Sequence, residues 1–340
     1  MRAPHWLWTG LAASLLWLGA AQADGPPPLG AQATIEALDR AHAAVVGVQV
    51  TATENAASIE TLGRQRRGSG VAIGADGLIL TIGYLLLDAA TIDIVTPDQQ
   101  SLPARAVAYD TATGFGLVRP LLPLPSLRPV PLGSVRDVQV GDLVMAATGG
   151  ADGDVNMTEL VSQRRFSGAW EYHLDQALFT SPPIENHSGA PLFNLRGELL
   201  GVGNLLLLDV MGNGQRQLGN LFVPVDLLKP ILAELQQSGS SRASQRPWLG
   251  LTLNDQEGRV EVIRVSQDSP AETAGLKAGD LLLAVDGITV TSLETFYKRL
   301  WDRPTPDAEI QLTVVQRAEV KTLQLHGTER TTRFSRPAGI

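Results

Sequence analysis

Between Val46 and about Val225, short β-type segments follow one another with only turn signals between them. Apolar runs such as "GVAIGADGLILT", "TIDIVTP" and "GELLGVGNLLLL" are bounded by Gly, Pro and Asp, and no amphipathic helix separates them. The stretch Gly74-Ala75-Asp76-Gly77 between two such runs is a strong hairpin signal. Many short strands without intervening helices predict an all-β barrel or sandwich.

Helical patterns flank this β-rich region. Residues 24–45 comprise a Pro-rich leader followed by an Ala-rich segment. Apolar residues recur with helical spacing over residues 31–46, which predicts one amphipathic helix there. The segment "PVDLLKPILAELQQ", residues 224–237, predicts a closing amphipathic helix. We therefore assign the β-rich domain to residues 46–237. The polar stretch "SGSSRASQRP", residues 238–247, predicts a flexible linker.

A second domain of mixed α and β structure is predicted over residues 248–328. Ser269 and Pro270 form a helix start, and Asp286-Gly287 is a hairpin turn between apolar runs. The segment 292–302 has the spacing of an amphipathic helix, and residues 309–327 predict a pair of strands. The remaining residues, 329–340, predict a disordered tail.

The first 23 residues have the pattern of an export signal. Arg2 precedes an apolar run that ends in Ala21-Gln22-Ala23, the small-x-small pattern that a signal peptidase cleaves. We expect cleavage after Ala23 and a mature protein outside the cytoplasm, most simply in a bacterial periplasm. The alternative is a retained anchor, but the apolar run is short for a membrane span and no later segment is suitable.

Composition excludes several classes of function. The net charge is −8 and no long basic run occurs, which argues against a nucleic-acid partner. The chain has no cysteine, so disulfides, thiol catalysis and thiolate metal sites are excluded. Its histidines are scattered and no carboxylate cluster has ligand spacing, so neither a metal nor another cofactor is expected.

Several stretches together resemble one known family. They are "GSGV" followed by "GADGLILT", then "YDTATGFGLVR", "VGDLVMA", "HSGAPLFNLRGELLGV" and "GNLFVPVDLLKPIL", with "WLGL" and "SPAETAGLKAGDLLLAVDG" in the second domain. In sequence and spacing these resemble the HtrA/DegP family of chymotrypsin-like serine proteases with PDZ domains. The resemblance implies a mostly β fold, with a double β-barrel domain followed by one α+β PDZ domain.

The catalytic triad of that family is altered in this chain. Ser188 stands at the position of the nucleophile, but a serine needs a base within reach and an acid that orients the base. Tyr84 occupies the histidine position, and Gly114 occupies the aspartate position, four residues after Asp110. Tyrosine titrates at about pH 10 and is a weak base at neutral pH. The resemblance therefore implies a vestigial nucleophile in a degenerate site.

The serine loop also departs from the family pattern. Asn186-His187-Ser188 replaces Gly-Asn-Ser, and the glycine of that pattern helps to form the oxyanion hole in the family. Asn tolerates positive φ better than most residues, so we expect a damaged hole to survive. Two histidines remain as alternative bases: His187 would have to bend back on its own backbone, and His173 lies about a strand earlier. No lysine precedes Lys229, which excludes a Ser–Lys dyad in the barrel domain.

The second domain retains the features that peptide binding requires. PDZ domains add a peptide to a sheet edge and bind its carboxylate with backbone N–H groups. The resemblance assigns a carboxylate-binding loop, the start of the pairing strand and the far wall of the groove. The carboxylate-binding loop is Trp248, Leu249, Gly250 and Leu251, and the pairing strand starts with Leu251 and Leu253. The far wall of the groove is formed by Leu293, Phe296, Tyr297 and Leu300. For Leu293 and Leu300, packing of the domain core is an equal alternative.

Three hypotheses follow. The first is an exported HtrA-like protein with a degenerate site that binds peptide C-termini or unfolded segments, as an adaptor, a chaperone-like factor or a modulator of an active relative. The second is an active serine endopeptidase of protein quality control that uses Ser188 with an unorthodox base. The third is a structural subunit of an envelope assembly. Family members form trimers through N-terminal segments, often with aromatic contacts, but residues 24–45 contain no aromatic residue, so the oligomeric state stays open.

Overall fold

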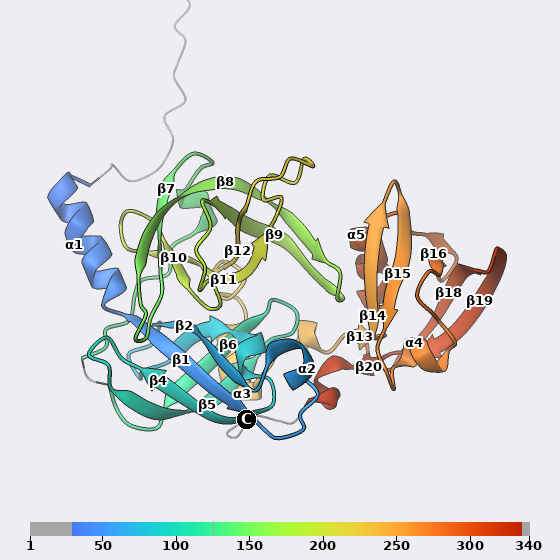
Figure 1. Ribbon diagram of the computed structural model, residues 1–340, viewed down its shortest axis with the longest axis horizontal. Helices are drawn as coiled ribbons and strands as arrows, with labels where there is room; N and C mark the ends of the chain where they lie inside the picture. The colour runs from blue at the N-terminus through green and yellow to red at the C-terminus, as the bar shows by residue number, and fades with distance from the viewer. Residues whose placement is uncertain (1–28, 125, 335–340) are drawn as a thin grey trace, which may run out of the picture.

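The computed structural model describes residues 29–124 and 126–334 (Figure 1). The predicted export signal and its cleavage site lie outside the described residues. Two closed β-barrels are followed by a smaller domain of mixed structure. The prediction of a mostly β fold is therefore confirmed. Within the described ranges, no helix has both the length and the apolar character that a membrane span needs.

Six antiparallel strands close the first barrel in the order β1-β2-β3-β6-β5-β4. They are β1 (Val45–Ala52), β2 (Gln65–Ala72), β3 (Ile79–Ile82), β4 (Ala89–Val95), β5 (Ser101–Tyr109) and β6 (Phe115–Pro120). The hairpin predicted at Gly74-Ala75-Asp76-Gly77 joins β2 to β3, with Val71 opposite Leu80. Val48, Ile79 and other inward residues form the buried interior of this barrel.

The second barrel has the same number of strands, in the order β10-β11-β12-β9-β8-β7. They are β7 (Leu143–Ala147), β8 (Val155–Gly168), β9 (Tyr172–Ser181), β10 (Pro191–Phe193), β11 (Leu199–Leu207) and β12 (Gly219–Pro224). The strands β8 and β9 are long, and their hairpin extends from the barrel toward the C-terminal domain (Figure 1).

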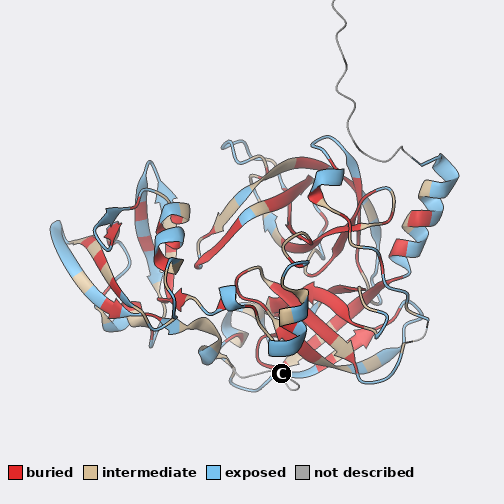
Figure 2. Ribbon diagram, turned by 180° about the vertical axis from the view of Figure 1, so that it is seen from behind, coloured by how far each residue is buried: buried red, intermediate tan, exposed pale blue. Residues whose placement is uncertain are grey.

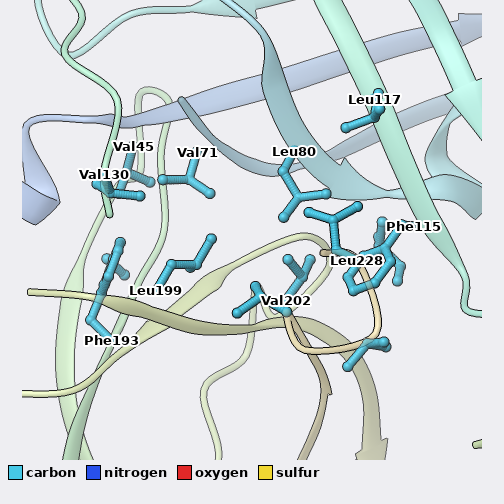
Figure 3. Packing of buried hydrophobic residues seen from close by; sticks show 14 of the residues in the cluster. Val45, Val71, Leu80, Phe115, Leu117, Val130, Phe193, Leu199, Val202 and Leu228 are labelled. Atoms are coloured by element: carbon cyan, nitrogen blue, oxygen red, sulfur yellow. The ribbon is translucent and has the colours of Figure 1, made fainter. Parts of the chain in front are cut away.

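One hydrophobic cluster joins the two barrels. Val71, Leu80 and Phe115 from the first barrel pack in the same cluster as Phe193 and Val202 from the second (Figure 3). All five side chains are completely buried. Because each fully buried large side chain contributes roughly 1.5–3 kcal/mol, this cluster fixes the two barrels against each other and therefore fixes the loops between them.

Short helices complete the barrel domain, and their bounds differ from the sequence prediction in two places. They are α1 (Ala31–His42), α2 (Ile59–Leu62), α3 (Leu232–Ser238) and the 3₁₀ turns η1 (Gly83–Leu86), η2 (Val135–Asp137) and η3 (Arg242–Ser244). The N-terminal helix ends at His42 because the next residues enter β1. The closing helix, predicted from residue 224, begins only at Leu232, because Pro230 disfavours helical geometry before it.

The C-terminal domain is built on an antiparallel sheet in the order β14-β15-β16-β18-β19, so β14 is an edge strand. Its elements are β13 (Pro247–Trp248), β14 (Leu251–Gln256), β15 (Arg259–Val265), α4 (Pro270–Thr273), β16 (Leu281–Val285), β17 (Ile288–Thr289), α5 (Leu293–Trp301), β18 (Glu309–Gln316), β19 (Glu319–His326), β20 (Thr328–Glu329) and the 3₁₀ turn η4 (Arg330–Arg333). The domain has a hydrophobic core of its own.

The prediction of a flexible linker over residues 238–247 is wrong. The buried carboxylate of Asp110 accepts hydrogen bonds from the hydroxyls of Ser241 and Ser244, both at 2.5 Å. The guanidinium of Arg246 lies 3.4 Å from the ring centre of Trp301. Side-chain contacts that the local sequence does not reveal therefore order the connection between the domains.

The prediction of a disordered tail from residue 329 is wrong for the part that the structure describes. Strand β20 pairs with β13, so Glu329 lies opposite Pro247. The guanidinium of Arg333 lies 5.0 Å from the ring centre of Trp248.

Figure 2 shows buried residues in the strands of both barrels, with exposed residues gathered on loops and outer helix faces.

Candidate functional site

Ser188 lies on the loop between β9 and β10, where the two barrels meet. Its backbone carbonyl accepts a hydrogen bond from the N–H of Ser69 on β2 at 2.8 Å, so the loop is fixed to the first barrel. Its side chain is partly exposed. The position is therefore accessible, and its chemistry depends on which groups surround the hydroxyl.

A tyrosine hydroxyl, rather than an imidazole, faces Ser188. The Tyr84 hydroxyl, on the 3₁₀ turn η1, lies 2.7 Å from Ser188 Oγ and 3.2 Å from the carbonyl oxygen of Asn204. A phenol has one proton and can donate to only one of these acceptors. Burial raises the pKa of Tyr84 above its ordinary value, although the hydrogen bond to Ser188 partly offsets this effect. Tyr84 is therefore neutral at physiological pH and is a poor proton acceptor.

Gly114, predicted at the third triad position, carries no carboxylate. Gly114 has φ of 89°, a conformation that side chains rarely adopt. A Cβ atom there would lie 3.1 Å from the hydroxyl oxygen of Tyr172. That hydroxyl donates to the carbonyl of Thr113 at 2.5 Å and accepts from the amide of Asn204 at 3.2 Å. Burial raises the pKa of Tyr172, so a second neutral phenol lies beside the position expected for the orienting acid.

Neither of the two alternative histidines forms a hydrogen bond to Ser188 in the described part of the chain. His187 Nδ1 donates to the carbonyl of Glu185 at 3.0 Å, which turns that side of the ring toward its own loop. Both ring nitrogens of His173 have partners: Ser167 Oγ lies 2.8 Å from Nδ1, and Asp175 Oδ1 lies 3.3 Å from Nε2. Burial lowers the pKa of both imidazoles.

The serine–histidine–carboxylate chain formed by Ser167, His173 and Asp175 lies on the β8–β9 hairpin. Ser167 and His173 are opposite residues of the β8–β9 ladder. Their contact is therefore a cross-strand pair of the kind that stabilises sheets.

The loop before Ser188 does not have the glycine-like backbone that was expected at Asn186. Among the described residues, Asn186 is not one of the non-glycine residues with positive φ, so the expectation of that conformation is wrong. Asn186 instead lines a cavity of about 210 Å³ together with Ser69 and Thr148. An oxyanion hole that requires positive φ at Asn186 therefore lacks the backbone geometry it needs.

An apolar cavity of about 600 Å³ lies beside the serine loop. Tyr84, Gly114, Tyr172 and His187 line one part, and Trp170 of the β8–β9 turn lines another. The C-terminal domain contributes Thr252, Arg264, Arg330 and Phe334 to the same cavity. Three of the site residues predicted in the barrel domain, Tyr84, Gly114 and His187, thus share one cavity with Trp170 of the β8–β9 turn, which the sequence did not indicate.

The predicted carboxylate-binding loop holds a carboxylate in this structure. The N–H groups of Leu249 and Leu251 donate to the Glu171 carboxylate at 3.0 and 2.8 Å. Gly250 between them has φ of 86°, and a Cβ atom there would lie 2.3 Å from Cβ of Ser269. Glycine is therefore required at this position. Glu171 itself is a residue that the sequence analysis did not identify.

The helix residues predicted for the groove wall are buried. Phe296, Tyr297 and Leu300 of α5 have no exposed surface. The hydroxyl of Tyr297 donates to the carbonyl of Gly168 at 2.7 Å and accepts from the N–H of Glu171 at 3.1 Å. Tyr297 therefore contacts the β8–β9 turn directly, while a role for Phe296 and Leu300 toward a free peptide stays a prediction.

No candidate metal site is found among residues 29–124 and 126–334, since no three His, Asp or Glu side chains there converge as ligands. The groups that carry the chemistry of the site are two phenols, a serine, an amide and backbone N–H groups. His187 lines the same cavity, but among the described residues the hydrogen-bond partner of Ser188 Oγ is the phenol of Tyr84.

The family models match both domains. Residues 68–202 match the trypsin-like peptidase domain, and residues 247–326 match the PDZ domain. A probable periplasmic serine endoprotease, DegP-like, from Halomonas elongata is 28% identical over 75% of this chain and 55% of its own length. A protein of the same description from Rickettsia conorii is 29% identical over 76% of this chain and 52% of its own length. The chain thus spans about half the length of the curated relatives it matches.

Solved structures show the same fold. The HtrA-type protease AlgW with decapeptide is 20% identical, covers 87% of this chain and 98% of its own, and has a TM-score of 0.56. The serine endoprotease from Yersinia pestis is 24% identical, covers 89% and 99%, and has a TM-score of 0.54. The chain is a trypsin-like β-barrel domain followed by a PDZ domain. In this order of domains, and over about three quarters of its length, it is similar to the DegP-like serine endoproteases.

Proposed function

We propose that this chain is an exported HtrA/DegP-like protein with a degenerate protease site, which binds peptide C-termini or unfolded segments through its PDZ domain. The observation that carries the proposal is the pair of groups at the triad positions. A neutral phenol lies 2.7 Å from Ser188 Oγ, and Gly114 stands where the orienting acid would be.

The expected loss of catalysis is large. In the serine protease subtilisin, removal of the catalytic base lowers kcat by a factor on the order of 10⁶. That factor corresponds to about 8 kcal/mol of transition-state stabilisation. The second phenol, Tyr172, cannot orient a base as a carboxylate does, because its pKa is raised by burial and it stays neutral. Hydrolysis at Ser188 is therefore not the function that this geometry favours.

Peptide binding is favoured by the loop that follows β13. Its backbone N–H groups hold a carboxylate, and the neighbouring strand β14 lies at the edge of its sheet. A PDZ domain uses these two features to bind an extended peptide that ends in a carboxylate. Binding without cleavage suits an adaptor, a chaperone-like factor or a modulator of an active protease. The relatives are named periplasmic, and we propose the same compartment for this chain.

The alternative is an active endopeptidase with an unorthodox base. Two observations favour it: Ser188 is present and accessible, and the relatives are named serine endoproteases. Digestion of casein by the full chain, beside the Ser188→Ala variant, separates the two functions. Equal and negligible digestion by both proteins supports the proposal, whereas digestion that the substitution abolishes makes the chain an enzyme.

The binding function has its own test. The full chain is titrated with a pool of labelled decapeptides whose last three residues are randomised and whose C-terminus is free. The same pool with amidated C-termini is the control. Preference for the free carboxylate supports PDZ recognition, and equal binding of both pools would contradict it.

A further inference from the structure

The PDZ site of this chain is occupied by the chain itself. Three residues, Ala169-Trp170-Glu171, form the turn between β8 and β9 of the barrel domain. Both functions of a PDZ site, carboxylate binding and strand pairing, are fulfilled by this turn. Figure 1 shows the β8–β9 hairpin directed toward β14 and α5.

The carboxylate of Glu171 lies where a peptide carboxylate is bound in this type of domain. It accepts N–H groups from Leu249 and Leu251 on the two sides of Gly250. Glu171 is only 3% exposed although it belongs to a tight turn. A glutamate at a turn would ordinarily be solvated, so its burial against these donors indicates a specific contact.

Strand pairing is imitated as well. The N–H of Leu253, on the free edge of β14, donates to the carbonyl of Ala169 at 2.8 Å. A peptide that adds to a sheet edge forms this kind of backbone hydrogen bond. From the other side of the groove, the hydroxyl of Tyr297 bonds the backbone at both ends of the turn.

The backbone of the turn is not optimal for glutamate. Glu171 has φ of 56°, in the left-handed region. A three-residue hairpin turn commonly needs this conformation at its last position, and glycine adopts it without a penalty. The turn alone therefore favours glycine at position 171, and the contact that the glutamate makes with the PDZ loop offsets its backbone strain.

We propose that the Ala169–Glu171 turn is an internal ligand of the PDZ domain, and that an incoming peptide carboxylate binds by displacing it. This inference rests on the proposed peptide-binding function and adds a competitor that the chain carries itself. Displacement also frees Trp170, which lines the cavity beside Ser188.

Because the turn competes with an incoming peptide, the apparent affinity for the peptide is the intrinsic affinity multiplied by the fraction of time that the PDZ site is open. A site that is open about a tenth of the time binds its ligand about tenfold more weakly than one that is always open. The Glu171→Gly variant removes the internal carboxylate and suits the backbone of the turn, so the barrel is expected to stay folded. Glu257→Gly is the matched control, because Glu257 also has positive φ, 52°, but is exposed in the β14–β15 turn.

Two measurements on the full chain test the proposal. Hydrogen exchange of the segment that contains Leu249, Leu251 and Leu253 is followed without peptide. We expect exchange about tenfold faster or more in Glu171→Gly than in the unmodified chain, and no change in Glu257→Gly. The randomised peptide pool with free C-termini should bind Glu171→Gly about tenfold more tightly or better, while the amidated pool gains nothing.

The outcomes separate this proposal from the proposed function. If the unmodified chain and Glu171→Gly bind the free pool equally, with a preference for the carboxylate, the peptide-binding function stands and the internal ligand is refuted. If exchange is the same in all three proteins, the internal ligand is likewise refuted. If exchange rises in Glu171→Gly but no protein distinguishes the free pool from the amidated pool, both peptide binding and displacement are refuted.

Discussion

The ionisation of Glu171 should make the stability of this protein fall as pH rises through neutrality. Burial raises the pKa of this carboxyl from 4.5 to about 7, against the smaller lowering effects of the Leu251 and Leu249 N–H groups, the charge of Arg330 and the Gly250 N–H. Arg246 and Tyr297 also face the carboxyl and interact with its charge. The folded state therefore prefers the protonated carboxyl in the range where the unfolded chain already ionises.

The sign and size follow from linkage. Because the folded pKa is above the unfolded value, the contribution is fully present below about pH 4.5 and is lost as pH rises through about 7. A shift of one pKa unit corresponds to about 1.4 kcal/mol, so the loss between pH 5 and pH 8 is about 2–3 kcal/mol. Glu171→Gln has nearly the same shape and never ionises, so it isolates this contribution.

The assay is urea unfolding followed by tryptophan fluorescence at pH 5, 6, 7 and 8. The free energy of unfolding of the unmodified chain, relative to Glu171→Gln, should decrease by about 2–3 kcal/mol across this series. The histidines titrate in the same window but are common to both proteins, so the difference removes their effect. A difference that stays constant within about 0.5 kcal/mol would show that the buried carboxyl is ionised throughout, and would refute the reasoning.

Other contacts of the site and the linker lead to three more predictions. Tyr297→Phe removes the hydroxyl that bonds both ends of the β8–β9 turn, and should lower the free energy of unfolding by about 1–3 kcal/mol in the same assay; no change would mean that water replaces the hydroxyl fully. Asp110→Ala leaves several buried donors without their acceptor, and should cost about 3 kcal/mol or more and expose the linker to limited proteolysis; a linker that stays resistant would contradict this. Tyr84→His should not restore casein digestion, because Gly114 supplies no carboxylate to orient the new imidazole; digestion by this variant would show that an orienting acid is unnecessary.

Much of the fold was predictable because its signals are local. The turn at Gly74–Gly77 and the Asp286-Gly287 turn lie between apolar runs, and both form the hairpins that such patterns predict. Ser269 caps α4 as expected, since its side chain accepts from the N–H of Glu272. The flanking motifs also predict Tyr84 and Gly114 at two triad positions, and the Tyr84 hydroxyl lies 2.7 Å from Ser188 Oγ.

The features that were missed depend on contacts between distant segments. Asp110 binds Ser241 of the linker, 131 residues later in the chain, and Tyr172 places its hydroxyl beside Gly114 from another barrel. No local pattern announces either contact. Glu171 had one weak signal in the sequence, since a glutamate stands between two aromatic residues at a hairpin turn where glycine is usual.

Whether the Ser188 hydroxyl is activated can be measured by its reactivity toward a fluorophosphonate probe, which reports an activated serine without needing a substrate. The full chain and Ser188→Ala are incubated with the probe at neutral pH, with trypsin as the positive control. We predict that labelling of the full chain does not exceed that of Ser188→Ala. Rapid and complete labelling that disappears with Ser188→Ala would contradict a degenerate site, because the hydroxyl would then be activated by a group that this structure does not place beside it.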